Sequence, residues 1–338
     1  MRIGKHDTAK RVFIIAEVGN NHEGDFGRAR EMIAAAAQAG ADAVKFQTIT
    51  PERLVSALQT ERIAQLSRFK FSQEQFAELA GLAQDNGLLF MSTPFDLEAV
   101  RLLAPLVPAF KIASPDNTFF PLIEAVASTG KPVLFSAGLC DRTELAASVA
   151  FLKSAWGAGE ASDVSDRLAL LHCVSAYPTP DDQAGLAAIP RLSGYGATPG
   201  YSDHTLGVDA AVLSVALGAR IVEKHFTLDK TREGFRDHQL SADPADMAAM
   251  VRRIRQAEAM LGTPQVCCAP CEEAGRVAYR RSIVAAVDLP PGTVLGPEHL
   301  DWVRPGGGLP PGHERALIGQ TLRAAKKRGE QILVEDVT

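Results

Sequence analysis

The chain has 338 residues, of which 46% are hydrophobic and 22% charged, and its formal net charge is −5 at pH 7. This length and composition predict a globular protein with one large domain and one small domain. The mild acidity and the lack of a basic run exclude nucleic acid and membrane surfaces as expected partners, and no segment has the pattern of a membrane span or a signal peptide.

Eight short apolar segments alternate with helical patterns as far as Gly262. We expect strands at residues 12–16, 43–47, 88–91, 109–113, 132–135 and 168–171, around Tyr201, and at 221–225. Such alternation is typical of a parallel α/β sheet, and eight repeats over about 250 residues predict a closed (β/α)8 TIM barrel. A doubly wound open sheet is the alternative, but no glycine-rich dinucleotide-binding motif follows the first strand.

Polar residues follow nearly every predicted strand. In a barrel the C-terminal ends of all strands surround one mouth, which is where active sites are built. The predicted ring at this mouth consists of Glu17, Lys45, Gln47, Ser92, Thr93, Lys111, Ser114, Ser136, Ser175, Tyr177, Ser202, His204, Lys224 and His225.

Two histidines in this ring point to a metal site. His204 and His225 stand at the ends of neighbouring predicted strands, and imidazole suits several transition metals while leaving coordination positions open for substrate oxygens. The alternative is that each histidine caps a strand or satisfies a local hydrogen bond.

Two lysines lie inside otherwise apolar strands. Burying a lone ammonium group is costly, so we expect Lys45 and Lys111 to face an anion or a carboxylate in the mouth. An internal ion pair would explain either lysine alone. Two lysines together with the serines of the ring favour a ligand that carries both a phosphate and a carboxylate.

The pattern changes after the predicted barrel, which we place at residues 1–263. Residues 264–279 are expected to be a linker and 280–338 a small domain, with a strand at 282–286 and a loop at 301–308. Cys268 and Cys271 form a single Cys-x-x-Cys pair, which is only half of a four-ligand metal set, so we interpret them and Cys267 as linker thiols. The odd total of five cysteines indicates no disulfide framework and favours a reducing, cytoplasmic location.

The strand-end segments together resemble one known family, the sialic acid synthases, which include legionaminic and pseudaminic acid synthases. The motifs that carry the resemblance, in chain order, are IAEVGNNHEG, AVKFQT, STPFD, KIAS, FSAG, HCVSAYPTP, GYSDHTLG, EKHFTLDK, RRSI and RPGGGLPP. The resemblance covers essentially the whole chain. It implies a TIM barrel followed by an antifreeze-like (SAF) domain, and an enzyme that condenses phosphoenolpyruvate with an amino sugar to a nine-carbon 2-keto-3-deoxy acid.

The resemblance also implies roles for individual residues. His204 and His225 would hold a divalent metal, usually Mn²⁺ and otherwise Mg²⁺ or Co²⁺, and Glu17 would transfer a proton nearby. Arg304 would reach the barrel of the other subunit in a domain-swapped homodimer, next to the sugar. The implied phosphoenolpyruvate-binding residues are Lys45, Thr93, Lys111, Ser114, Ser136 and Ser202, and the other implied sugar-binding residues are Gln47, Tyr177 and Asp237.

The chain departs from the family pattern where the sugar would bind. Ser114 is followed by Pro115-Asp116 instead of Gly-Glu, Val174 replaces a common asparagine, and Gly234-Phe235-Arg236 replaces a Gly-Pro pair. The sugar therefore stays open between N-acetylmannosamine and a 2,4-diacetamido-trideoxyhexose. The rival functions are another metal-dependent barrel enzyme, such as a seven-carbon keto-acid synthase or a class II aldolase, and a non-catalytic sugar-binding protein.

Overall fold

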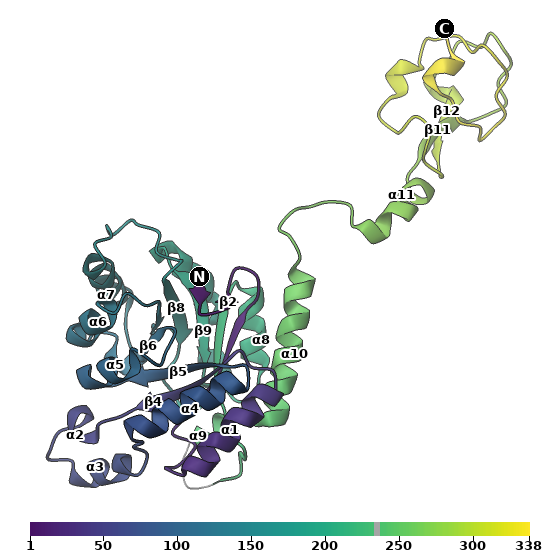
Figure 1. Ribbon diagram of the computed structural model, residues 1–338. Coiled ribbons are helices and arrows are strands. Elements are labelled where there is room, and N and C mark those ends of the chain that lie inside the picture. The colour runs from purple at the N-terminus through teal and green to yellow at the C-terminus, as the bar shows by residue number, and fades with distance from the viewer. Residues whose placement is uncertain (233–236) are drawn as a thin grey trace. The chain divides into compact units, whose positions relative to one another are not determined.

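The computed structural model describes residues 1–232 and 237–338 (Figure 1). The chain forms two compact units, Met1–Gly262 and Thr263–Thr338, and each is described by itself. The Gly234-Phe235-Arg236 segment singled out in the sequence lies outside the described residues. None of the helices in the described ranges is long and apolar enough to cross a membrane.

Eight parallel strands form a nearly closed barrel in the first unit, as the alternating pattern predicts. Their order around the sheet is β5-β4-β3-β10-β9-β8-β7-β6, and β5 and β6, at the two ends of this order, lie against each other. The strands are β3 (Phe13–Gly19), β4 (Ala43–Thr48), β5 (Leu89–Pro94), β6 (Phe110–Ile112), β7 (Val133–Ser136), β8 (Leu168–Cys173), β9 (Thr198–Asp203) and β10 (Ile221–His225). The TIM-barrel prediction is confirmed.

Helices cover the outside of the barrel (Figure 1). The sequence signals at their starts are satisfied: Asp25 caps α1 by accepting from Arg28 N, and Ser72 and Gln75 form a capping box at α4. Between β8 and β9, a 3₁₀ segment (Leu186–Tyr195) replaces an α-helix. The helices of this unit are α1 (Phe26–Gln38), α2 (Pro51–Leu54), α3 (Thr60–Ser67), α4 (Gln73–Asp85), α5 (Leu97–Leu103), α6 (Phe120–Ala127), α7 (Arg142–Ala155), α8 (Asp209–Ala216), α9 (Asp237–Leu240) and α10 (Pro244–Leu261).

The inside of the barrel is apolar at its N-terminal end. Inward-facing side chains from six of the barrel strands form one buried cluster there, with Phe13, Ile15, Met91 and Leu171 among its members. A short hairpin, β1 (Arg2–Ile3) with β2 (His6–Asp7), adds the fully buried Ile3 to this cluster. The sequence gives little warning of the hairpin because each of its strands has only two residues. Because this end of the barrel is filled with apolar side chains, the polar residues at the C-terminal ends of the strands are the candidates for a functional site.

The second unit contains α11 (Glu273–Tyr279) and the antiparallel strands β11 (Ser282–Ala285) and β12 (Leu300–Val303). The last residues of the predicted linker 264–279 are helical: a 3₁₀ turn (Pro270–Glu272) leads into α11. Part of the predicted loop 301–308 is wrong, because Trp302 pairs with Ile283 across the two strands. Since β12 is a short edge strand with one polar face, its sequence resembles a loop.

Candidate active site

Two adjoining chambers occupy the mouth of the barrel. The inner chamber, about 50 Å³, is lined by residues from all eight strand ends, and the outer chamber, about 750 Å³, is lined by residues of the loops above them. Gln47, Phe95, Pro115, Tyr177 and His225 line both. The predicted site residues that line the inner chamber are Glu17, Lys45, Gln47, Thr93, Lys111, Ser114, Ser136, Tyr177, Ser202, His204 and His225.

A buried cluster of two lysines and two glutamates forms the base of the inner chamber. Lys45 Nζ lies 2.9 Å from Glu17 Oε2 and 3.5 Å from Glu223 Oε2, and it donates to Thr93 Oγ1 at 3.0 Å. Lys111 Nζ lies 3.3 Å from Glu223 Oε1, which also accepts from Ser202 Oγ at 3.0 Å. Both lysines were expected to face a carboxylate or an anion, and the structure places them against the carboxylates of Glu17 and Glu223.

The pKa values of Glu17, Glu223 and Lys111 in this cluster shift in different directions from their ordinary values. Burial raises the pKa of Glu17 above its ordinary value; the charge of Lys45 opposes this and that of Glu223 reinforces it. Burial would also raise the pKa of Glu223, but Lys111 and Lys45 outweigh it and hold that pKa below its ordinary range. Burial lowers the pKa of Lys111 despite the attraction of Glu223. Glu223 is thus a fixed anion, whereas Glu17 is the carboxyl that can exchange a proton near neutral pH.

Glu223 was not among the residues predicted to surround the mouth of the barrel, whereas its neighbour Lys224 was. Successive side chains in a strand point to opposite faces, so Glu223 shares the inner face with Ile221 and His225. Lys224 is fully buried outside the barrel, 3.0 Å from Asp203 Oδ2, so its predicted place in the ring is wrong. Because every second residue of a strand faces the same side, His225 at the mouth predicts that Glu223, two residues earlier, also faces the inside of the barrel.

Ser92 is wrongly placed in the ring for the same reason. Its hydroxyl lies 2.8 Å from Thr48 Oγ1, and it does not line the inner chamber, whereas its neighbour Thr93 does. The hydroxyls of Ser136 and Ser175 are buried with no hydrogen-bond partner among the described residues. A Cβ added to Gly138 would lie 2.6 Å from Ser114 Oγ and 2.8 Å from Ser175 Oγ, so only glycine lets these hydroxyls come so close. Free hydroxyl donors around a backbone without a side chain suit an oxyanion.

The two histidines lie side by side at the rim of the inner chamber. Their ring centroids are 5.3 Å apart, and the Tyr177 ring lies 4.3 Å from that of His204. His204 Nδ1 donates to the carbonyl oxygen of Val174 at 2.7 Å, which leaves its Nε2 as the nitrogen with a lone pair. Burial, with the neighbouring His204, keeps the pKa of His225 well below its ordinary value, and its buried Nδ1 has no partner among the described residues.

Burial would lower the pKa of His204, but its contacts with Cys173 and the Val174 carbonyl raise it above the ordinary value, unlike that of His225. Imidazole nitrogens are suitable metal ligands when the ring is neutral, so we expect metal binding to displace any proton on His204. No group of three or more His, Cys, Asp or Glu residues that could hold a metal occurs within residues 1–232 and 237–338, so the protein would supply only these two side chains. The histidine pair therefore fits a metal that keeps several positions for water or substrate.

The outer chamber brings together residues from the segments that follow six of the strands, β3, β4, β5, β6, β8 and β10. Asp237 lines it, as predicted, and so does Asp116, from the segment where the chain departs from the family pattern. Asn20 and Arg62 also line it and were not assigned to the site from the sequence. Asp116 Oδ2 is buried without a partner in the described chain, and burial raises the pKa of this carboxyl to about 6. Arg304 belongs to the second unit, where its guanidinium lies 6.0 Å from the centroid of the Tyr279 ring.

Comparison with known proteins identifies the family. The NeuB family model matches residues 32–266, and the SAF domain model matches residues 280–338. The chain belongs to the NeuB family. The resemblance drawn from the strand-end motifs is thereby confirmed, and so is the SAF domain.

Curated relatives of this NeuB-family chain match it along nearly their whole length. The chain is 36% identical to the N,N'-diacetyllegionaminic acid synthase of Legionella pneumophila, covering 96% of this chain and 94% of that one. It is 35% identical to a pseudaminic acid synthase of Campylobacter jejuni, covering 99% of both. The crystal structure of a sialic acid synthetase from Leptospira borgpetersenii superposes with a TM-score of 0.75 at 34% identity, covering 81% of this chain and 94% of that one.

Proposed function

We propose that this protein condenses phosphoenolpyruvate with an N-acetylated hexose, giving a nonulosonic acid and inorganic phosphate. The observation that carries the proposal is the pair of adjoining chambers. A lysine- and hydroxyl-rich inner chamber suits a small dianion, and it opens beside two histidines into a chamber large enough for a sugar. The names of the relatives support the same reaction.

Phosphoenolpyruvate would occupy the inner chamber. Its phosphate and carboxylate would accept hydrogen bonds from Lys45, Lys111 and surrounding hydroxyls, with Glu223 holding both ammonium groups in place. The hydroxyl donors assigned to this ligand are those of Thr93, Ser114, Ser136 and Ser202. Ser136 Oγ supports the assignment because it is buried and has no hydrogen-bond partner among the described residues.

A divalent metal, which we propose to be Mn²⁺, with Mg²⁺ and Co²⁺ as substitutes, would be held by His204 and His225. When bound, such an ion would polarise the aldehyde of the open-chain sugar. Val174 orients His204 through the 2.7 Å hydrogen bond to its carbonyl oxygen. The asparagine-to-valine departure leaves this backbone contact possible, because it needs only the carbonyl oxygen of residue 174.

The protein's own groups would then hold the reactants and move one proton. C3 of phosphoenolpyruvate forms a bond to the sugar aldehyde carbon, water adds at C2, and phosphate leaves as the C2–O bond breaks. Glu17, held by Lys45 and lying 3.4 Å from Gln47 Nε2, would accept the proton of the added water. A carboxyl whose pKa is raised by burial suits this task better than the fixed anion Glu223.

The sugar would bind in the outer chamber through Gln47, Tyr177 and Asp237. We further propose that Arg304 of a second subunit completes this site in a domain-swapped homodimer. Arg304 is followed by Pro305 and three glycines, which suits a loop that places a guanidinium in a neighbouring mouth. Its contribution would include excluding water from the reacting carbon.

A substrate panel tests the proposal. The protein is incubated with Mn²⁺, phosphoenolpyruvate and one sugar at a time, and phosphate release and product mass are measured. We expect turnover with N-acetylmannosamine or a 2,4-diacetamido-trideoxyhexose. Turnover with only a four-carbon aldose phosphate would indicate a seven-carbon keto-acid synthase, and sugar binding without phosphate release would indicate a binding protein.

A further inference from the structure

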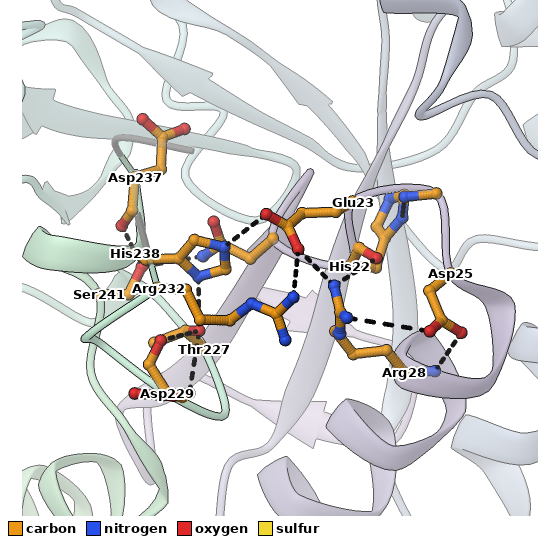
Figure 2. A network of polar contacts seen from close by, with 12 residues as sticks. His22, Glu23, Asp25, Arg28, Thr227, Asp229, Arg232, Asp237, His238 and Ser241 are labelled. Carbon is orange, nitrogen blue, oxygen red and sulfur yellow. Dashed lines mark hydrogen bonds and ion pairs between the residues drawn. The ribbon is translucent and has the colours of Figure 1, made fainter. Parts of the chain in front are cut away.

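Glu23, in the loop between β3 and α1, is the centre of an ion-pair network at the rim of the barrel. Its carboxylate lies 2.5 Å from Arg28 Nη1, 2.9 Å from Arg232 Nη2 and 3.5 Å from His238 Nε2. Figure 2 shows the carboxylate between the two guanidinium groups, with the His238 ring facing it. The side chain is 20% exposed, so these pairs are shielded from water more than ordinary surface pairs.

Two of these three partners, Arg232 and His238, belong to the segment 226–241 that carries Asp237, here called the Asp237 loop. Arg232 precedes Asp237 in the chain, and His238 follows it directly. His238 is fully buried, and its Nδ1 lies 2.7 Å from Thr227 Oγ1, so its ring bridges the start of this loop and Glu23. Glu23 thus binds the chain on both sides of a residue that lines the outer chamber.

A second contact fixes the same loop from the same side. Asn21 Nδ2 donates to Phe226 O and to Ser241 Oγ, both at 2.9 Å, and Ser241 Oγ donates to Asp237 O at 2.5 Å. Asn21 therefore contacts both ends of the segment 226–241, while Glu23 contacts Arg232 and His238 between them.

The loop that presents Glu23 is itself firmly held. Asn20 donates to Gln47 Oε1 at 2.8 Å, and the His22 ring stacks on Phe71 with centroids 4.4 Å apart. A Cβ on Gly24 would lie 1.9 Å from Arg68 O, so the backbone here packs directly on the segment after α3. Glu23 has φ +51°, a left-handed conformation that such residues seldom adopt. Strain of this kind persists where surrounding contacts impose it, often beside functional sites.

We propose that Glu23 is a positioning residue for the sugar substrate, acting through Arg232 and His238 to hold Asp237 at the outer chamber. The inference rests on the proposed function, because it assigns Asp237 to the sugar. Removing the carboxylate charge takes the ion pair at 2.9 Å from Arg232 and leaves Arg28 paired with Asp25 at 3.9 Å, so the two guanidinium groups would repel each other and the Asp237 loop is expected to move away. The inner chamber, built from strand ends, should be unaffected.

Steady-state kinetics of Glu23→Gln provide the first test. The variant keeps the shape of the side chain and loses its charge. We expect the KM for the sugar to rise about tenfold, the loss expected for a charge-assisted contact, while the KM for phosphoenolpyruvate stays within about twofold. Glu78→Gln, which removes the exposed Glu78–Arg30 pair at 3.4 Å, is the matched control and should change neither KM.

A double-mutant cycle separates positioning from simple stabilisation. If Glu23 acts through Asp237, Glu23→Gln should add little to the sugar KM once Asp237 is asparagine. Arg232→Met, at a position whose side chain is 40% exposed, should raise the sugar KM in the same direction and also be non-additive with Glu23→Gln. Additive effects in both cycles, or equal effects on both substrates, would overturn the proposal.

Amide hydrogen exchange gives a readout that does not depend on turnover. In Glu23→Gln, peptides covering residues 226–232 and 237–241 should exchange faster than in the unchanged protein, while β3 and β10 keep their protection. Unchanged exchange in these peptides would overturn the proposal even if the protein proved inactive with every sugar. Faster exchange in a protein without activity would instead refute the proposed function alone.

Discussion

The inner chamber is built mainly from residues on strands, whereas the outer chamber is built mainly from residues on the segments between strands and helices. The inner chamber consists of alternate residues on neighbouring strands, so the hydrogen-bonded ladder fixes the spacing of Glu17, Lys45 and Glu223. The outer chamber consists of loop residues such as Arg62, Asp116 and Asp237, whose positions depend on contacts between loops. Under the proposed function, the strand scaffold would therefore set the reaction type and the loops would set the choice of sugar.

The largest effect should come from the boundary between the chambers, where the two histidines lie. Chelation should abolish turnover and Mn²⁺ should restore it, and His204→Ala or His225→Ala should each lower kcat by about a thousandfold, since a metal contributes several kcal/mol to such a step. Circular dichroism should show an intact fold. Full activity of the chelated protein would contradict the metal assignment.

Arg304 tests whether the outer chamber is completed by a second subunit. Arg304→Ala and His225→Ala homodimers should both be nearly inactive. After subunit exchange, about half of the activity per heterodimer should return, because one of the two equivalent sites then has an intact barrel and an intact arginine. Failure of mixing to restore activity, with heterodimers demonstrated by mass, would place the arginine in its own chain's site.

Lys111→Met tests the inner chamber alone. The change keeps the length of the side chain and removes a charge 3.3 Å from Glu223. The KM for phosphoenolpyruvate should rise by about tenfold to a hundredfold, the value of one charge-assisted contact, with little change in the KM for the sugar. A change in the sugar KM only would reverse the assignment of the two chambers.

The pH dependence of activity tests Glu17 as the proton acceptor. Burial raises its folded-state pKa, so the reactive carboxylate is present above that pKa and is lost as pH falls through it. The acidic limb of kcat/KM should therefore lie above the ordinary value of 4.5 for glutamate. Glu17→Gln should remove most activity and leave no such limb, whereas an unchanged limb in this variant would assign it to another group.

The smallest effect is expected for Asp116 in the outer chamber. Its buried Oδ2 has no partner in the described chain, so it is available to a hydroxyl or amide of the sugar. Asp116→Asn should raise the KM for the sugar by about threefold to tenfold and leave that for phosphoenolpyruvate unchanged. Equal KM values in the variant and the unchanged protein would remove Asp116 from the sugar site.

The contrast between strand residues and loop residues also explains which parts of the site could be predicted from the sequence. The eight strands and most of the inner chamber follow from apolar runs that end in polar residues, and these features are local. Lys224 was chosen over Glu223 because polarity was considered without strand alternation, which assigns the two side chains to opposite faces. Arg62 and Asn20 could not be placed, because their loops are positioned by contacts such as Asn20–Gln47 that join distant segments.

The fate of the bridging oxygen of phosphoenolpyruvate tests the central claim most directly. Phosphoenolpyruvate labelled with ¹⁸O between C2 and phosphorus is incubated with the protein, Mn²⁺ and an accepted sugar, and both products are weighed by mass spectrometry. The account predicts a nonulosonic acid without the label and inorganic phosphate that carries all of it, because the C2–O bond breaks. Label retained in the sugar acid, or phosphate released without a condensed product, would contradict the account.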